Sequence, residues 1–467
     1  MKLAPALFAL LFLGCGAPPL VLPPPFGQVG DQTPRLFFPT GMAVTGDGGL
    51  LVANGNYNHA FEAGTMVSLD PAWINSLYAR GLRCEKPINN GLPAQFAAGC
   101  DDPIPTAAFR GIAMIGNYAG PLTLDDAGTS AYTGSRDTNI LNGVSLLPNG
   151  GLYCHGGGSS DIDCRKGVID LNAAALLEGP YAIVPGVGRL PGSDTDARVL
   201  YVAALIPHVD QIQSGTLYTS ATVAALDMND PTQVVFSMLA SSAFFASGIG
   251  VGPMVFEPVR RQLFMSGCFQ RYLGGAGSPS SGRCSSLSSN ILRVLDVDAG
   301  ASAQVRIYDM SINPSTGSTS GLLLGGGDPA SGKPADTLWA SVRNPDALIE
   351  MDLPVTPSTA PAIRQTTSLP VSPADLVRIP RPGGSDLIAV VASRLGALVI
   401  YDTGARAVVA QLERLGDVPF TLKLLPAPAG TARLAVSVFG DCRVAFVEVP
   451  IDQPWLAALR GRAGSCP

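Results

Sequence analysis

The sequence predicts an all-β protein, a seven-bladed β-propeller of four-stranded antiparallel blades, and three observations support this fold class. A middle strand ending in small residues and a closing strand ending in Asp or Glu recur seven times between Pro39 and Pro450. Helical periodicity is scarce, and 54 glycines and 40 prolines suit many tight turns. A unit of three or four short strands cannot bury its own apolar face, so neighbouring units must stack, as propeller blades do.

The repeat is readable in two strands of each unit. The middle strand reads, in chain order, LLVAN from Leu50, SAYTG from Ser130, LYVAA from Leu200, LFMSG from Leu263, LWASV from Leu338, IAVVAS from Ile388 and LAVSV from Leu434. The closing strand reads VSLD from Val67, VID from Val168, VAALD from Val223, LRVLD from Leu292, LIEMD from Leu348, LVIYD from Leu398 and VAFVE from Val444. Such short apolar runs bounded by Gly, Pro or Asp are typical of buried strands, and the recurrent carboxylate is expected to cap a turn. Short helices are predicted only at Pro71 to Gly81, where Trp73, Leu77 and Tyr78 would share a face, and at Leu171 to Leu177.

The first and sixth units carry a family resemblance. The first reads Pro39-Thr40-Gly41 into an apolar strand, then Leu51-Val52-Ala53-Asn54 and Val67-Ser68-Leu69-Asp70. The sixth reads Pro373 to Val377, then Leu398 to Thr403. These units resemble the repeat of the YVTN-type seven-bladed β-propellers, in which Pro-x-Gly, Tyr-Val-Ala/Thr-Asn and an apolar strand ending in Asp follow one another. The resemblance is weaker in blades two to four. It implies the fold and a binding role, and it brings no catalytic motif.

The N-terminus predicts export. Residues 1–14 form a signal peptide with a basic start and an apolar run that is too short to span a bilayer as a helix. Gly14 before Cys15 resembles the bacterial lipoprotein processing site, which implies cleavage before Cys15 and its lipidation, although Phe12 stands where Leu is usual. Because Gly16 rather than Asp follows Cys15, the resemblance favours the outer membrane. The alternative is a simple secretory signal with an unpaired Cys15. Residues 15–34, rich in Pro and Gly, are expected to form an extended tether.

The cysteines predict local disulfides. Nine are present, and setting Cys15 aside leaves eight, which we expect to pair as sequence neighbours: Cys84 with Cys100, Cys154 with Cys164, Cys268 with Cys284, and Cys442 with Cys466. Each pair lies within one repeat or its insertion, whereas cysteines of distant blades would be too far apart. Zinc binding is disfavoured because no Cys-x-x-Cys spacing occurs. Disulfides persist only in an oxidising compartment.

Insertions indicate where a site would lie. Long connections between the second and third strands are expected in blade two (Ser135 to Gly167), blade three (Ala204 to Ala221) and blade four (Ser266 to Ser289), all on one face. Loops on a rigid scaffold commonly carry binding residues. The three histidines of the chain, His59, His155 and His208, are each expected in such a second-to-third loop.

The chemistry available in these loops is limited. His155, Asp161 and Asp163 lie between Cys154 and Cys164 and invite a metal interpretation, but a disulfide-closed Gly-rich turn with solvated carboxylates is favoured. Similar turn roles are expected for the remaining acidic and glycine clusters, which lack the spacing of calcium or phosphate loops: Asp101-Asp102, Asp194-Thr195-Asp196 and Gly325 to Asp328. No Gly-x-Ser-x-Gly motif is present. We therefore predict no catalytic residue, no metal and no cofactor.

Charge excludes one class of partner. Charged residues make up 14% of the chain, the formal net charge is −6, and no basic stripe occurs, so nucleic acid is not expected as a partner. The favoured function is a lipid-anchored, monomeric cell-envelope module, attached to the membrane through its N-terminal lipid, that presents a loop-rich face to a protein or glycan. The alternative is a lactonase-like propeller hydrolase with its site at the channel mouth. A quinoprotein would need repeated tryptophan motifs, which three isolated tryptophans do not supply.

The ends of the chain predict how the ring closes. The propeller is expected to span residues 35–450, and its seventh unit supplies strands at Pro419 to Leu424, Leu434 to Val438 and Val444 to Val449. Pro454 disfavours a further strand, so Arg35 to Phe38 should complete blade seven as its outer strand. Residues 451–467 would then form a tail across the blade, tied by Cys466 to Cys442.

Overall fold

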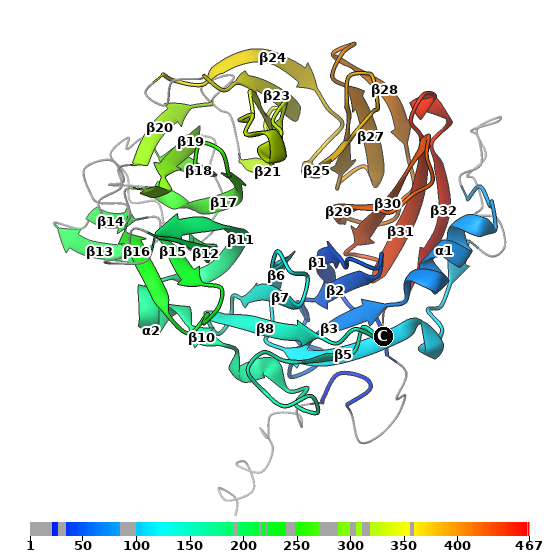
Figure 1. Cartoon of the computed structure of the whole chain (residues 1–467), viewed down its shortest axis with the longest axis horizontal. Helices are drawn as coiled ribbons and strands as arrows, with labels where there is room; N and C mark the ends of the chain where they lie inside the picture. The colour runs from blue at the N-terminus through cyan, green and yellow to red at the C-terminus, as the bar shows by residue number, and fades with distance from the viewer. Residues whose placement is uncertain are drawn as a thin grey trace, which may run out of the picture.

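The structure, a computed structural model, is a closed ring of seven blades around a central opening (Figure 1). It describes residues 21–26, 34–84, 100–189, 195–206, 208–213, 216–220, 222–239, 248–270, 288–298, 305–310, 318–354, 359–464 and 466. Within each blade the four main strands pair antiparallel and follow chain order from the innermost strand outward. The predicted fold class is confirmed. The predicted signal peptide and Cys15 lie outside the described residues.

The strands of the first three blades are, from the innermost outward: in blade one β1 (Pro39–Val44), β2 (Leu50–Asn54), β3 (Gly64–Leu69) and β5 (Phe109–Ile115); in blade two β6 (Ala119–Leu124), β7 (Ser130–Ser135), β8 (Ile140–Leu146) and β10 (Ile169–Asp170), with β9 (Leu152–Cys154) also on β8; in blade three β11 (Glu178–Arg189), β12 (Asp196–Ile206), β15 (Thr222–Asp227) and β16 (Val234–Leu239). A separate hairpin joins β13 (His208–Gln213) to β14 (Thr216–Ser220).

The other four blades follow the same order: in blade four β17 (Gly248–Glu257), β18 (Gln262–Gln270), β19 (Ser288–Asp296) and β20 (Val305–Asp309); in blade five β21 (Thr319–Gly325), β22 (Thr337–Val342), β23 (Ala347–Asp352) and β24 (Ala362–Ser368); in blade six β25 (Pro373–Ile379), β26 (Leu387–Ala392), β27 (Ala397–Asp402) and β28 (Ala407–Leu412); in blade seven β29 (Pro419–Leu425), β30 (Thr431–Val438), β31 (Arg443–Pro450) and β32 (Ala458–Ala463).

The apolar core lies between neighbouring blades. One buried cluster joins Val391 of blade six to Val436 of blade seven, and another joins Tyr201 of blade three to Leu263 of blade four. Every residue of the middle strands β2, β22 and β26 is buried. Because both faces of each blade are covered, these strands read as continuous apolar runs in the sequence.

The recurrent carboxylates cap turns, as predicted. Asp227 Oδ1 accepts the N–H of Asn229, and Asp402 Oδ1 accepts those of Gly404 and Ala405. Asp70 caps helix α1 (Pro71–Ala79) by accepting the N–H of Ala72.

Both short helices form. In α1 the buried side chains are Ile74, Leu77 and Tyr78, while Trp73 packs edge-on against Phe446 of blade seven. The second helix, α2 (Leu171–Ala175), is shorter than the predicted segment because Leu176 adopts a left-handed conformation, with φ of 53°, and ends it.

The predicted strand assignment in blade two is wrong. Its third strand is β8, which pairs directly with β7, whereas the segment from Val168 supplies only the two-residue outer strand β10. The sequence masks β8 because Asn142 and Gly143 interrupt its apolar run. Both are nonetheless enclosed: Asn142 is fully buried, accepting the N–H of Gly116 and donating to the Ser135 hydroxyl.

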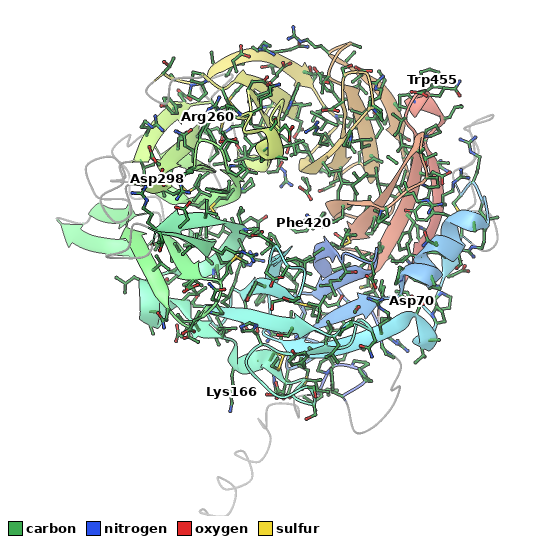
Figure 2. The ribbon with its side chains drawn as sticks, in the orientation of Figure 1. Asp70, Lys166, Arg260, Asp298, Phe420 and Trp455 are labelled. Atoms are coloured by element: carbon green, nitrogen blue, oxygen red, sulfur yellow. A yellow bond between two sulfur atoms is a disulfide. The ribbon has the colours of Figure 1, made fainter. Side chains whose placement is uncertain are left out.

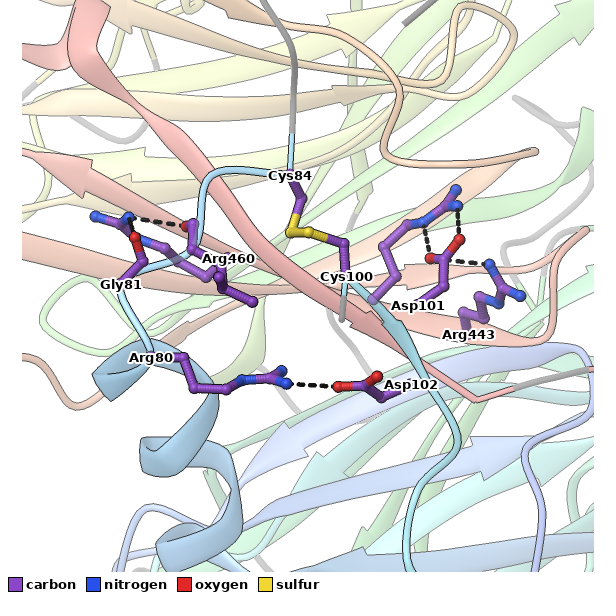
Figure 3. The surroundings of a disulfide bond; sticks show 10 residues. Arg80, Gly81, Cys84, Cys100, Asp101, Asp102, Arg443 and Arg460 are labelled. Atoms are coloured by element: carbon purple, nitrogen blue, oxygen red, sulfur yellow. Dashed lines mark hydrogen bonds and ion pairs between the residues drawn. A yellow bond between two sulfur atoms is a disulfide. The ribbon is translucent and has the colours of Figure 1, made fainter. Parts of the chain in front are cut away.

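The predicted closure of blade seven is also wrong. The chain resumes after the turn at Pro454 and forms β32, which pairs with β31 as the fourth strand, so the propeller extends past residue 450 to Ala463. A fifth strand, β4 (Asp101–Asp102), comes from the insertion in blade one and pairs parallel with β32 (Figure 3). The insertion of the first blade therefore pairs with the outer edge of the last blade and links the two ends of the ring.

The segment before β1 packs without becoming a strand. Leu36 and Phe37 are 0% and 1% exposed, and Leu36 belongs to the cluster that contains Val444 and Ala463 of blade seven. Asn54, at the end of β2, holds this segment by accepting the N–H of Phe37 on its Oδ1. The prediction that residues 35–38 lie against blade seven is thus correct in location and wrong in pairing.

Candidate functional site

The two faces of the ring carry different connections. Because the strands alternate in direction, the second-to-third connections and those between blades share one face, which we call the loop face. The first-to-second and third-to-fourth connections share the opposite face. The blade-three insertion forms the β13–β14 hairpin on the loop face, as predicted, and residues 271–287 of the blade-four insertion lie outside the described residues.

The blade-two insertion lies on the opposite face. It follows β8, so it connects the third and fourth strands. His155 is therefore separated from His59, which lies in the second-to-third loop of blade one, and from His208, which begins β13. The prediction that all three histidines share one face is wrong.

The loop-face mouth of the channel is lined by a ring of β-bulges. In all seven blades the register of the innermost strand shifts at its beginning, where it leaves the loop face. Bulges re-aim side chains and are frequent at barrel rims and next to functional sites. The partly exposed bulge residues include Pro121, Tyr181, Ser320, Asp375 and Phe420. Figure 2 shows Phe420 beside the central opening.

The residue directly before the bulge has an unusual backbone conformation in five blades. Its φ is positive: Phe38 (52°), Tyr118 (51°), Gly179 (61°), Ser372 (66°) and Val418 (53°). Four of the five carry a side chain, and such residues rarely adopt this conformation. The surrounding structure must hold them there, a feature that recurs at functional sites.

An aromatic–arginine cluster occupies the loop face where blades seven, one and two meet. It consists of Phe38, Tyr57, Tyr118, Arg136 and Phe439. The Tyr57 ring packs edge-on against Tyr118 at 4.9 Å and against Phe439 at 5.1 Å, centroid to centroid. The Phe38 ring lies 5.1 Å from Phe439.

Arg136 is the cation of this cluster. Its guanidinium lies 5.2 Å from the centroid of the Tyr57 ring and 5.8 Å from that of Tyr181, and it donates to the Tyr57 hydroxyl and to the Tyr118 carbonyl. Burial lowers the pKa of Arg136, an effect that the nearby Tyr181 opposes. No carboxylate among the described residues forms an ion pair with it, so aromatic rings and neutral oxygens hold this cation.

His59 extends the cluster outward. Its Nε2 lies 2.6 Å from the Tyr118 hydroxyl, and the two rings meet edge-on at 4.9 Å. His59 is exposed, so it stands at the rim of the cluster rather than among buried groups.

Asp375 is the one carboxylate among the bulge residues, and its role is structural. Its Oδ1 accepts the N–H of Leu376 at 2.9 Å, and its Oδ2 accepts that of Leu422 in the next blade at 3.0 Å. Burial raises the pKa of Asp375, an effect that Lys423 and these two N–H groups oppose. The carboxylate therefore links the innermost strands of blades six and seven.

The predicted metal candidates do not form a site. Asp163 pairs with Arg165 at 2.7 Å, Asp161 Oδ1 lies 3.6 Å from Cys154 Sγ, and His155 Nδ1 lies 3.3 Å from the hydroxyls of Ser130 and Ser145. Burial lowers the pKa of His155. Among the described residues no three His, Cys, Asp or Glu side chains gather as a metal site.

The other acidic pairs take part in ion pairs. Asp101 and Asp102 bind Arg462 and Arg80, and Asp196 binds Arg261 at 2.7 Å. Asp194 lies outside the described residues. Gly325 ends β21, and Asp328 caps a short turn by accepting the N–H of Ala330. These positions serve turns and blade contacts.

Three disulfides form between predicted partners: Cys84 with Cys100, Cys154 with Cys164, and Cys442 with Cys466. The fourth predicted pair, Cys268 with Cys284, is outside what the structure describes because Cys284 is not included. The disulfides indicate a secreted, non-cytoplasmic protein. In the described part of the chain, no helix combines the length and apolar character needed to cross a bilayer.

The residues of the aromatic–arginine cluster escaped the sequence prediction, although a positional signal exists. Arg136 directly follows the middle strand β7, as Arg343 follows β22, and Phe439 directly follows β30. A charged or aromatic residue in that place must project at the loop face, close to the channel. Alignment of the middle strands could have placed these residues at the loop face, but their contacts with one another form only in the assembled ring.

Similarity to known proteins is found among solved structures, at low sequence identity. No protein-family model matches the chain, and no curated protein sequence matches it. Among solved structures, it is similar to the Cps50 (Swd1) β-propeller domain of Myceliophteria thermophila, with 11% identity, a TM-score of 0.49 and coverage of 89% of this chain and 97% of that one. A proposed 6-phosphogluconolactonase of Bacteroides uniformis is 12% identical, with a TM-score of 0.45 and coverage of 74% and 91%. Sqt1 of Saccharomyces cerevisiae is 10% identical, with a TM-score of 0.43 and coverage of 91% and 85%.

Proposed function

We propose that the chain is a YVTN-type propeller, anchored to the cell envelope by a lipid on Cys15, that acts as a non-catalytic binding module. The partner, a protein or glycan, would dock on the loop face at the channel mouth. The observation that carries this proposal is the aromatic–arginine cluster, which gathers Tyr57, Tyr118 and Phe439 around Arg136 at that mouth.

The composition of the cluster suits binding. Tyr and Arg dominate the residues that contribute most to protein interfaces, and aromatic rings also stack on sugar faces. Ring contacts between blades hold these side chains in place before a partner arrives, which reduces the entropy lost on binding. Arg136 would pair with an acidic group of the partner, since no carboxylate of the described chain pairs with it.

Hydrolysis at the same mouth has less support. A hydrolase needs a group that is free to move a proton or attack the substrate. Asp375 is the carboxylate that the bulges bring to the channel, and both of its oxygens accept backbone N–H groups. Both carboxylate oxygens are thus used in hydrogen bonds that together link blades six and seven.

The export proposal rests on cysteine chemistry and on the N-terminal sequence. Three disulfides in the described residues match an oxidising compartment such as the bacterial envelope. The Pro- and Gly-rich segment after Cys15 would then hold the ring away from the outer membrane, with the loop face available to a partner.

Site-directed photo-crosslinking of the full-length protein in intact cells tests this function. A photoreactive residue at Tyr57 should capture a defined partner, and Arg136→Ala should reduce the yield at least tenfold. A photoreactive residue at Lys166, which is exposed at the outer edge of blade two (Figure 2), is the matched control. Equal capture from both positions, or capture that is insensitive to Arg136→Ala, would refute a partner site at the channel mouth.

A further inference from the structure

A pocket separate from the channel mouth lies between blades five and six, on the face opposite the loop face. Its volume is about 270 Å³, and its walls include Trp339, Glu350, Arg364, Arg378, Asp386 and Arg406. They come from the ends of β21, β23 and β25 and the beginnings of β22, β24, β26 and β28, all at that face. The function proposed above makes no use of this pocket.

Glu350, in the wall of this pocket, has one carboxylate oxygen without a hydrogen-bond partner in the described chain. The residue is 3% exposed, and its Oε1 accepts from Arg364 at 2.8 Å and from Arg406 at 3.5 Å. Its Oε2 is buried and accepts no hydrogen bond within the described chain. A buried carboxylate oxygen without a donor is unfavourable, so the pocket is built to receive a donating group there.

The charges around Glu350 balance. Three carboxylates line the pocket, those of Asp336, Glu350 and Asp386, and three arginines face them. The pairs are already formed: Arg378 Nε lies 2.5 Å from Asp386 Oδ2, and Arg364 bonds Glu350. An occupant that brought a net charge would disturb this balance, which favours a neutral ligand.

The remaining wall offers hydroxyls and an aromatic surface. Thr337, Ser385 and Thr403 bring hydroxyl groups. Each hydroxyl already donates to an oxygen of the chain, so what it offers a ligand is an acceptor. Trp339 is 5% exposed, and Tyr401 holds its ring edge-on at 5.6 Å. A ligand that fits must donate to a carboxylate and to these hydroxyls, accept from guanidinium groups, and place C–H groups against apolar walls.

We propose that this pocket binds one residue of a neutral sugar, with a sugar hydroxyl donating to Glu350 Oε2. Hydroxyls provide donors and acceptors on the same atom, and the C–H face of a pyranose supplies the apolar side. The volume, about 270 Å³, lies just below the roughly 300–1,000 Å³ of small-molecule pockets, which suits a single ring better than an extended oligosaccharide. Free monosaccharides and the terminal residue of a glycan share this chemistry.

Calorimetric titration of the folded protein tests the proposal. The probes are D-glucose, D-galactose, D-mannose and N-acetyl-D-glucosamine, with their methyl glycosides to represent glycan ends. D-Glucuronate serves as the charged comparison and glycerol as the acyclic one. We expect saturable binding of at least one neutral sugar, with at least tenfold weaker binding of glucuronate and glycerol.

Two variants locate the binding. Glu350→Gln keeps the size of the side chain and removes the charged acceptor, so affinity should fall at least tenfold. Because Glu350 also bonds two arginines, Gly384→Tyr provides a second test: Gly384 lies in the exposed β25–β26 turn, and a Cβ there would meet only the flexible Arg381 side chain, at 3.2 Å. Its ring should obstruct the pocket without touching Glu350.

Gly46→Tyr is the matched control. Gly46 occupies the first-to-second turn of blade one on the same face, where an added Cβ meets nothing within 4 Å. Sugar binding retained in Gly46→Tyr and lost in Gly384→Tyr, with equal Tm values for the two variants, would support the site. Absence of binding by every neutral sugar, stronger binding of glucuronate, or binding unchanged by Gly384→Tyr would overturn it.

Discussion

Asp101 and Arg462 are 361 residues apart in the chain and form a bidentate ion pair, with hydrogen bonds of 2.7 and 2.6 Å from Nε and Nη2 to the two carboxylate oxygens. Arg462 belongs to the last strand and Asp101 to the insertion in the first blade, so the pair joins the two ends of the ring. Arg443 adds a third contact to Asp101, at 3.1 Å. The N–H of Cys84 also bonds the carbonyl of Leu459, which extends the junction along β32.

Asp101→Ala should destabilise the protein. Arg462 has 8% of its side chain exposed, so the substitution removes the nearest carboxylate from a buried cation, and Asp441 lies farther away, at 3.6 Å. We expect a loss of about 1–2 kcal/mol in the free energy of unfolding, because Asp101 itself is partly exposed and screened. Denaturant unfolding gives the value. Asp102→Ala breaks the more exposed pair with Arg80 and should cost under about 1 kcal/mol, so an equal or larger loss there would contradict the central part given to Asp101.

The contribution of Asp101 should depend on pH. Burial alone would raise its pKa, but the hydrogen bonds and charges of Arg462 and Arg443 outweigh that effect and hold the pKa below the ordinary 3.8. The unfolded chain therefore binds the proton more readily, and the stabilisation is complete above pH about 5 and is lost as the pH falls through the lowered native pKa. The difference in stability between the native protein and Asp101→Asn should shrink below pH 3.8. A difference that stays constant down to pH 2.5 would show that the charge of Asp101 does not contribute.

The segment before β1 should stabilise the ring although it forms no strand. Leu36 and Phe37 are buried between blades one and seven, so Leu36→Ala should cost about 2–5 kcal/mol. Removal of residues 16–38 should lower Tm far more than removal of residues 16–32. Val21→Ala, at a position that is 52% exposed, is the control and should change stability by less than about 0.5 kcal/mol. Equal Tm values for the two truncations would be incompatible with this packing.

Cys15→Ser should release the protein from membranes. If Cys15 carries the lipid, its acyl chains hold the protein by about 0.8 kcal/mol per buried CH₂. Fractionation of cells followed by high-salt washing measures the effect, and Gly16→Ser is the matched control that should stay in the membrane fraction. Undiminished membrane association of Cys15→Ser would mean that another attachment exists.

The fold was predictable because the middle strands are buried on both faces. LWASV and IAVVAS carry no polar face to break the signal, and β22 and β26 appear where these runs stand. In blade two the apolar pattern did not identify the third strand. Asn142 lies in the true third strand, and its partners Gly116 and Ser135 satisfy it only once the blades are assembled.

The last strand, β32, was not predicted for a related reason. The segment ALRGRA, which is β32, reads as solvated because it holds two arginines. Its charges are satisfied by Glu448, which bonds Arg460 at 2.6 Å, and by Asp101 from the far end of the chain. Pro454 does interrupt the strand order as predicted, but the interruption is a turn and the sheet continues after it.

Three features follow from local sequence: the seven-fold repeat, the carboxylates that cap its turns and the local cysteine pairs. Each depends on residues close together in the chain. Assembly of the ring sets the remaining features: how the ring closes, which face carries each insertion, and which side chains meet at the channel mouth and in the pocket of blades five and six. Arg136 contacts rings from two other blades, and Glu350 takes its second arginine, Arg406, from the neighbouring blade. Such contacts join residues of different blades. They depend on how the blades are placed relative to one another in the closed ring, and no local sequence pattern specifies that placement.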